Sequence, residues 1–421
     1  MRVTPGPRLK IPALIKRNTI LISISQCFNP AGMQMGYGIG PLMVIALAGS
    51  TSLAGMSVGL FAVSRFFVAY PVGKITDAYG RKPGILLGLV LGGLGSLLIG
   101  LSLTIRSLPT LMVGLLVLGM GLNATQQLRV AAADMFPASM RARALGFVAT
   151  GSLGGLALAP ALTAAGDRYG SAWGIEPLAV PWLLLPFFLL LSMGLVFLIR
   201  PDPKVIGERL GDYYPGHAVH AAKATSVTGT SFRPSDFLRT PGITLAVAAN
   251  TAAQANMSMI MVLTSLILQH QGHSLGAIGF SHAFHSAGMF AFTLPLGWVA
   301  DRYGREKVLY PGLTITILGA GLVGFGHGFW IVTLGTFLVG LGWSGANVAS
   351  TALISDQAET KYRGRAIGLL DSFAAAAALT AALVTGPMIH WQGLGAVGIM
   401  AAVIAAIPLL MRFAFRRPQP V

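Results

Sequence analysis

The segment PVGKITDAYGR at residues 71–81 returns, with changes, as PLGWVADRYGR at residues 295–305. A second set of residues repeats at nearly the same offset of about 222 to 224 positions: Asp134, Arg141, Arg143, Ala144 and Gly146 correspond to Asp356, Arg363, Arg365, Ala366 and Gly368. Self-similarity at one fixed spacing indicates a duplicated structural unit. The sequence therefore predicts two related halves, residues 1–200 and 241–421, joined by a polar linker at 201–240.

The composition is that of a chain embedded in lipid. Hydrophobic residues make up 54% of the 421 residues and charged residues only 10%, and the mean hydropathy is +0.71. Such a chain has too few polar residues to cover a surface in water. Apolar stretches long enough to cross a hydrocarbon core about 30 Å thick lie at 18–48, 53–72, 83–105, 108–131, 144–166, 178–200, 241–270, 275–299, 307–327, 329–354, 366–389 and 393–413.

The basic residues indicate the orientation in the membrane. A net charge of +16 suggests a nucleic-acid partner in a polar chain, but here Lys and Arg collect in cytoplasmic loops. With the N-terminus inside, all 29 Lys and Arg residues fall on the cytoplasmic side except Arg65, Arg106, Arg129 and Arg168. We therefore expect a multi-pass protein of a bacterial inner membrane, with both termini cytoplasmic, the first span retained and no nucleic-acid partner.

The two copies of the 71–81 segment lie in short cytoplasmic loops, after the second span of each half. Glycine allows a tight turn there, and the Arg can pair with the acidic residue that closes the fourth span. We expect ion pairs between Arg81 and Asp134 and between Arg305 and Asp356.

These loops resemble the signature of the Major Facilitator Superfamily, Gly-x-x-x-Asp-x-x-Gly-Arg followed by Lys or Arg. Residues Gly73 to Lys82 match it in full, and the second copy departs at Glu306. The resemblance covers nearly the whole chain. It implies an all-α membrane protein of twelve helices in two homologous six-helix bundles, which rock about a central site to expose it to each side in turn.

The cargo must be inferred from polar groups inside the spans, which are costly there and usually functional. Met257 and Met261 are four residues apart, and so are His285 and Met289. Counted from the turn at Gly272, the two pairs lie level to within roughly 3 Å, at about 1.5 Å per residue. We expect three thioethers and one imidazole to face one point.

Thioether sulfur favours Cu(I), whereas Mg or Mn would require carboxylates that these spans lack. The paired motifs also resemble those of the CcoA-like copper importers, a branch of the superfamily in bacteria that assemble copper-containing cytochrome oxidase. The resemblance implies that Met257, Met261, His285 and Met289 bind copper and pass it inward. It also implies copper chaperones of oxidase assembly as partners.

Further ligand candidates are His282, the single cysteine Cys27, and Met33 and Met35, which follow the Asn29-Pro30 helix break. Because Met33 and Met35 are two residues apart, only one can face inward. The alternative for each Met is a flexible gap-filler in the membrane core, and for each His a hydrogen-bonded packing residue. Met259 points off the common face and is interpreted as packing.

Gating is expected from charged residues of both halves: Asp77, Arg81, Asp134, Asp301, Arg305, Asp356, Arg65 and Asp371. Asp77 is expected against the start of the eleventh span, as a latch between the bundles. Asp371 lies inside that span and needs a partner there. Arg65 is the expected one, and the bridge would open with the cytoplasmic gate.

A second function remains open within transport. A proton-coupled carrier of an organic anion or drug would use Arg65, Arg129 and Asp371, with the Met residues as apolar lining. An enzyme is not expected, because no constellation of nucleophile, base or metal-binding carboxylates is present, and a receptor would need a sensory domain. We expect a monomer without a cofactor.

Overall fold

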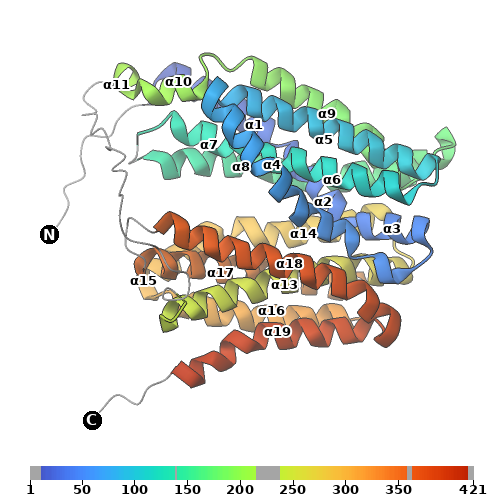
Figure 1. The fold of residues 1–421 in the computed structure, drawn as a ribbon. Coiled ribbons are helices and arrows are strands. Elements are labelled where there is room, and N and C mark those ends of the chain that lie inside the picture. Colours follow the sequence, from blue (N-terminus) through green and yellow to red (C-terminus); the bar gives the residue numbers. More distant parts are fainter. Residues whose placement is uncertain (1–10, 138–139, 215–237, 358–362, 416–421) are drawn as a thin grey trace, which may run out of the picture.

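The computed structural model describes residues 11–137, 140–214, 238–357 and 363–415, and this part of the chain is almost entirely helical, with no strand. The helices of the two predicted halves form two bundles that lie side by side with their long axes roughly parallel (Figure 1). The short helices α10 (Pro203–Glu208) and α11 (Leu210–Tyr213) lie at one end, on the left of Figure 1. We call this the linker end and the opposite one the far end.

The N-terminal bundle consists of α1 (Ala13–Gln26), α2 (Asn29–Gly38), α3 (Gly40–Ala48), the 3-10 helix η1 (Thr51–Leu53), α4 (Met56–Tyr79), α5 (Arg81–Thr104), α6 (Leu108–Ala124), α7 (Gln127–Asp134), α8 (Arg141–Trp173) and α9 (Val180–Phe197). The C-terminal bundle consists of α13 (Pro241–His270), α14 (Leu275–Ala291), α15 (Thr293–Tyr303), α16 (Glu306–Phe325), α17 (Phe329–Gln357), α18 (Arg363–Gln392) and α19 (Leu394–Phe415).

Nine helices of the described chain are long and apolar enough to cross a membrane, and two bent pairs raise the number to as many as eleven. The remaining expected span, 275–299, is divided at Phe292 into α14 of 17 residues and α15 of 11 residues. Its helix is therefore interrupted, which the apolar pattern of the sequence did not reveal.

The first expected span, 18–48, is broken twice. α1 ends at Gln26 and α2 begins at Asn29 with Pro30 in its first turn, while α3 begins at Gly40 with Pro41 in its first turn. Proline has no N–H to donate to the preceding turn, so a helix restarts readily at this residue. The predicted break at Asn29-Pro30 is present, and the second break adds a bend of 43°.

Glycine lets two pairs of helices approach closely, one pair in each bundle. Between α5 and α6, a Cβ at Gly95 would lie 2.2 Å from the Leu118 backbone nitrogen, and one at Gly121 would lie 2.3 Å from that of Gly92. Between α16 and α17, a Cβ at Gly342 would lie 2.5 Å from the Gly312 carbonyl oxygen. The third and fourth spans of each half therefore pack in the same way, as expected of a duplicated unit.

Both predicted loop ion pairs are present. Arg81 Nε lies 2.7 Å from Asp134 Oδ2, and Arg305 Nε lies 3.0 Å from Asp356 Oδ2. Arg305 also pairs with Asp301, and hydrogen bonds to these two carboxylates raise the pKa of Arg305.

The turns before these loop arginines depend on glycine. Gly80 and Gly304 have φ angles of 97° and 102°, which residues with a side chain rarely adopt. The glycines of the repeated segment thus allow α5 and α16 to start directly after α4 and α15.

The first part of the expected linker is attached to the N-terminal bundle. Asp202 accepts hydrogen bonds from the backbone N–H groups of Arg81 and Lys82, each at 3.0 Å. The Lys82 ammonium donates to the Ile199 carbonyl oxygen at 2.9 Å, and Tyr214 is buried. Residues 215–237 lie outside the described part of the chain.

The glycine contact between α5 and α6 gives a test of the packing. We expect Gly121→Ala to destabilise the protein by about 1–3 kcal/mol, because the added methyl group meets backbone that cannot move aside. Gly93→Ala is the matched control on α5, since a Cβ there has no neighbour within 4 Å. Thermal unfolding in detergent measures both variants, and equal melting temperatures would contradict the close approach.

Candidate substrate cavity

Two adjoining cavities lie between the bundles. The larger has a volume of about 620 Å³ and the smaller about 100 Å³. Residues from both halves line each of them, and they share Met33, Tyr37, Leu122, Gln126 and Arg129. A space between the two bundles is where a carrier that rocks about its centre must hold its cargo.

Three of the predicted ligands meet at the smaller cavity. Met257 and Met261 on α13 and Met289 on α14 form one buried cluster, against which Tyr37 and Trp343 pack. Their side chains are 5%, 3% and 9% exposed, and all three line the smaller cavity. The four-residue spacing thus brings the two methionines of α13 to the same face.

The orientation of His285 defines the state of its ring. Nδ1 lies 2.8 Å from the carbonyl oxygen of Thr336 on α17. A carbonyl oxygen only accepts, so in the neutral ring Nδ1 carries the proton and Nε2 keeps its lone pair. Nε2 is buried and has no hydrogen-bond partner among the described residues. The lone pair of His285 Nε2 is therefore free to coordinate a ligand. His285 lines the same cavity as the three methionines.

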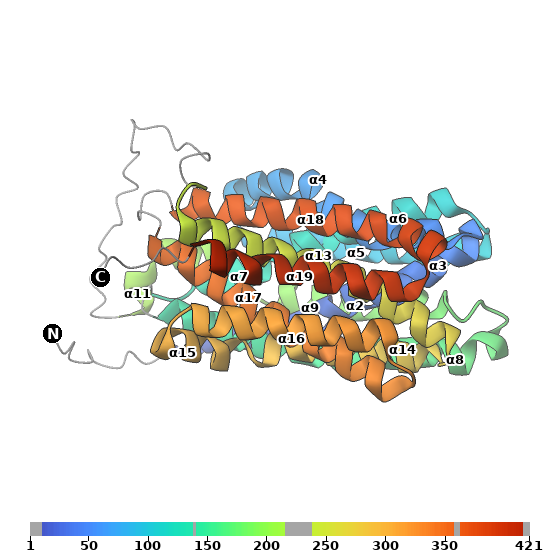
Figure 2. The same ribbon diagram turned by 90° about the horizontal axis from the view of Figure 1, so that it is seen from below.

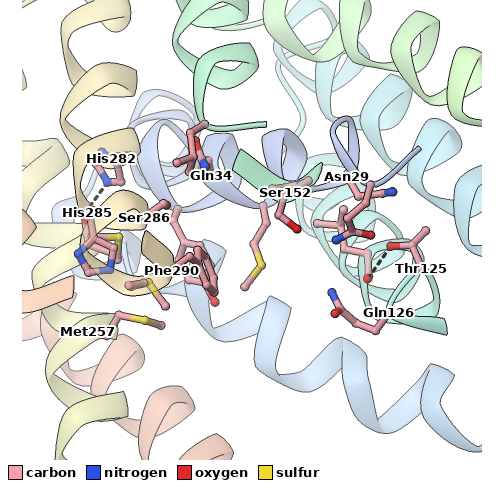
Figure 3. A pocket seen from close by; sticks show the side chains of 18 of the residues that line it. Asn29, Gln34, Thr125, Gln126, Ser152, Met257, His282, His285, Ser286 and Phe290 are labelled. Carbon is pink, nitrogen blue, oxygen red and sulfur yellow. Dashed lines mark hydrogen bonds between the residues drawn. The ribbon is translucent and has the colours of Figure 1, made fainter. Parts of the chain in front are cut away.

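Figure 3 shows how these groups lie. His285 and Met257 are on one side of the space together with Ser286 and Phe290, while Thr125 and Gln126 lie across it. The C-terminal bundle supplies the first set and the N-terminal bundle the second. A small molecule or ion at this place would contact both bundles.

His282 differs from His285 in that both of its ring nitrogens have partners. Nδ1 lies 3.0 Å from the Ile278 carbonyl oxygen and Nε2 lies 3.3 Å from Ser265 Oγ. The ring lines the smaller cavity and is 1% exposed. Its hydrogen bonds favour the packing role over that of a ligand.

The other candidate sulfur ligands, Met33, Met35 and Cys27, lie in different surroundings. Met33 is 41% exposed and lines both cavities, whereas Met35 is 1% exposed and lies in the hydrophobic core. Cys27 donates a hydrogen bond to the Ser23 carbonyl oxygen at 3.5 Å and lines neither cavity. As expected, only one of Met33 and Met35 faces inward. Met259 lies in the main core rather than in the methionine cluster.

The larger cavity has a polar wall. Its charged and amide residues are Arg65, Asn123, Gln126, Gln127, Arg129, Asn250, Gln254, Asn347 and Asp371. Some of them are tied to each other across helices: Asn347 Nδ2 donates to Asn250 Oδ1 at 3.2 Å, and Trp343 donates to Gln254. The Arg129 guanidinium has no hydrogen-bond or ion-pair partner in the described part of the chain.

Some residues line the cavities without having been expected from the sequence, among them Tyr37, Trp343 and Asn347. Trp343 and Asn347 are four residues apart on α17 and therefore share a face. That spacing of an aromatic and an amide inside an apolar span was a usable signal. Tyr37 gave no such signal, because its position depends on the breaks that tilt α2.

One of the two predicted contacts between the bundles is not formed, and the other falls partly outside the described residues. Arg65 and Asp371 both line the larger cavity, but no ion pair joins them in this structure. The Asp77 carboxylate is 80% exposed and its ion-pair partner is Arg81 of its own half. The expected position of Asp77 against the start of the eleventh span stays a prediction, because residues 358–362 and the side chains at the start of α18 lie outside the described part of the structure.

The helices that carry Arg65 and Asp371, α4 and α18, are in close contact toward the far end. There a Cβ at Gly55 would lie 1.6 Å from the Ala382 carbonyl oxygen, and Gly59 lies against Leu379. Farther along the same helices, toward the linker end, Arg65, Val72 and Asp371 line a cavity instead. The cavity is thus closed at the far end and extends toward the linker end.

No group of three or more His, Cys, Asp or Glu side chains is placed to hold a metal ion in the residues that the structure describes. A metal bound here would depend on the thioethers and on His285.

The proteins that are similar to this chain include membrane transporters, in agreement with the observed fold. The chain is 29% identical over 388 residues to the uncharacterised transporter YdeG of Bacillus subtilis, covering 90% of this chain and 88% of that protein. It is 25% identical to the riboflavin transporter RfnT of Brucella anthropi, over 94% and 96% of the two chains. The structure is similar to the xylose transporter XylE from E. coli in a partially occluded inward-open conformation, with a TM-score of 0.69, 13% identity and coverage of 97% and 100%.

The family assignment rests on matches in both halves. The Major Facilitator Superfamily model matches residues 22–255 and again residues 245–421, which together take in nearly all of the chain. The repeated loops, the two bundles and the cavity between them agree with these matches. The chain is a multi-pass membrane transporter and belongs to the Major Facilitator Superfamily.

Proposed function

We propose that this transporter imports copper as Cu(I) across a bacterial inner membrane by alternating access, with Met257, Met261, His285 and Met289 as its ligands. The observation that carries the proposal is the buried lone pair of His285 Nε2, which has no partner and lies in the same cavity wall as three clustered thioethers. A buried acceptor without a partner is costly. A soft metal ion would satisfy it.

The chemistry of the four groups favours Cu(I) over other ions. Thioether and imidazole are neutral, so Cu(I) binding releases no proton from them. Soft sulfur donors select Cu(I), whereas Mg and Mn prefer oxygen. The hydrogen bond from His285 Nδ1 to Thr336 orients the ring, as the outer partners of metal-binding histidines do.

The proposed inward direction is compatible with the shape of the cavity and with the positions of the basic residues. The cavity extends toward the linker end, where the loops rich in Lys and Arg lie. Such loops are cytoplasmic in membrane proteins. In this arrangement the chain acts as a monomer with both termini in the cytoplasm, and it delivers copper to chaperones of cytochrome oxidase assembly.

Copper uptake tests the proposal directly. We expect Met257→Ala and His285→Ala to lower the uptake of radioactive copper by cells at least about tenfold, the scale seen when metal sites lose supporting groups. Met259→Ala is the matched control, because Met259 is on the same helix but lies in the main core. Uptake that stays unchanged in Met257→Ala and His285→Ala, at equal protein levels, would refute copper as the cargo.

A second function is favoured by the larger cavity. Its volume of about 620 Å³, its amides and the unpaired Arg129 suit an organic molecule with several hydrogen-bonding groups better than a bare ion. The relative RfnT is a riboflavin transporter. In this alternative, a proton-coupled carrier of an organic anion or drug uses Arg65, Arg129 and Asp371.

Uptake of riboflavin tests one cargo of the second function. If the organic cargo is right, Arg129→Gln should lower riboflavin uptake at least about tenfold, the scale of losing a charged hydrogen bond, and Met257→Leu should leave it unchanged. Under the copper proposal riboflavin is not carried at all. Riboflavin uptake equal to that of cells without the transporter therefore excludes this cargo.

The unformed pair of Arg65 and Asp371 tests alternating access itself. The two charges line one cavity without touching, so we expect them to pair when the linker end closes. Arg65→Ala or Asp371→Ala should each impair transport, because each leaves one charge buried in the closed state. The double swap Arg65→Asp with Asp371→Arg should restore part of the transport activity. A swap no better than the worse single variant would rule out the bridge.

A further inference from the structure

Besides the contact between α4 and α18, the far end has a contact between the bundles that joins a carboxylate to the start of a helix. Asp167 lies on α8 of the N-terminal bundle, and α14 belongs to the C-terminal bundle. Asp167 Oδ1 accepts a hydrogen bond from the Leu275 backbone N–H at 3.1 Å, and Oδ2 accepts one from that of Gly276 at 2.7 Å. Figure 2 shows α8 and α14 side by side at this end.

The contact uses groups that have no partner within their own helix. The first N–H groups of a helix lack intrahelical acceptors and carry a partial positive charge. The Ser274 hydroxyl accepts from Ala277, so α14 caps one of these groups itself. The Asp167 carboxylate from the other bundle accepts hydrogen bonds from two more of these N–H groups.

Small residues continue the seal along α14. A Cβ at Gly276 would lie 3.0 Å from that of Ala164, and one at Gly279 would lie 2.3 Å from Thr163 Oγ1. The next residues of α14 toward the cavity include His285 and Met289, which line it. Separating α8 from α14 would therefore remove the part of the far-end seal that lies next to these lining residues.

The corresponding contact of the other half has no charge. There Gly386 of α18 lies against η1, where a Cβ would come within 2.2 Å of the Ser52 carbonyl oxygen. Among the described residues of these two related contacts, one carboxylate lies on a helix start, that of Asp167, and the second contact is a close approach of glycine to backbone.

We propose that Asp167 is the gate residue of the far end. Its carboxylate holds the start of α14 while the cavity extends to the linker end, and it releases α14 when the cavity opens to the far side. The inference rests on alternating access and not on the identity of the cargo. Asp167 therefore sets the balance between the two conformations without touching the cargo.

Labelling of a single cysteine measures that balance. Cys27→Ser removes the native cysteine, and Leu156→Cys places a reporter in the wall of the smaller cavity. A membrane-impermeant maleimide is added from the far side or from the linker side, using vesicles of both orientations. In this background Asp167→Ala should raise the rate of labelling from the far side about threefold to thirtyfold, the range for losing a helix cap, and lower it from the linker side.

Further variants separate a gate from a general loss of structure. Asp167→Asn keeps one acceptor oxygen and should give a smaller shift, while Gly279→Ala should act as a wedge and shift labelling in the same direction as Asp167→Ala. Asp202→Ala is the matched control, because Asp202 also caps a helix start, that of α5, but within one bundle. Labelling of the Asp202→Ala variant should equal that of the protein that carries only Cys27→Ser and Leu156→Cys.

Two outcomes would overturn the proposal. The first is unchanged far-side labelling in both Asp167→Ala and Gly279→Ala, with both proteins present at normal levels. The second is labelling that rises from both sides, which would mean a loosened structure and not a shifted gate.

Discussion

Every backbone N–H and C=O group in the hydrocarbon core of a membrane must find its partner within the protein, and the architecture follows from this constraint. It explains why the described chain is helical almost throughout, and why its helix breaks are few. Breaks are tolerated only where protein or a cavity surrounds them. The breaks before α2 and after α14 meet this condition, since residues of both helices line the central space. Irregular backbone and the binding site thus occur together.

The same constraint applies to side chains. Some polar groups inside the spans are satisfied by a neighbour, as in His282 and the pair of Asn347 and Asn250, and others face the cavity, as in Arg129. Several amide and hydroxyl oxygens are buried without a partner among the described residues, including Gln26 Oε1 and Gln34 Oε1 beside the smaller cavity. His285 differs from the other candidate metal ligands, because its Nδ1 has a partner while its Nε2 is buried without one. The methionines around it supply soft atoms but no hydrogen-bond donor. This mismatch, more than the number of methionines, is what favours a metal ion.

The sequence was sufficient for the fold and for part of the site. The repeat of the 71–81 segment and the apolar stretches predicted the two halves, and the acidic and basic residues of the loops predicted both ion pairs. Spacing along one helix placed Met257 with Met261. Contacts between the two bundles were harder to predict, because they change with the conformation. The proposed pairing of Arg65 with Asp371 is not formed in this conformation, and the split of the 275–299 span depends on local geometry at Phe292 that its apolar pattern does not encode.

The attachment of residues 199–214 to the N-terminal bundle affects how the two bundles move. Asp202, Lys82 and Tyr214 fix this segment to α5 and α7, so α10 and α11 must travel with the N-terminal bundle as part of one rigid body. The covalent tether between the moving bodies then starts after Tyr214 and not at residue 201. A shorter tether restricts how far the bundles can separate at that end, and it makes the position of α10 a direct reporter of the motion of the N-terminal bundle.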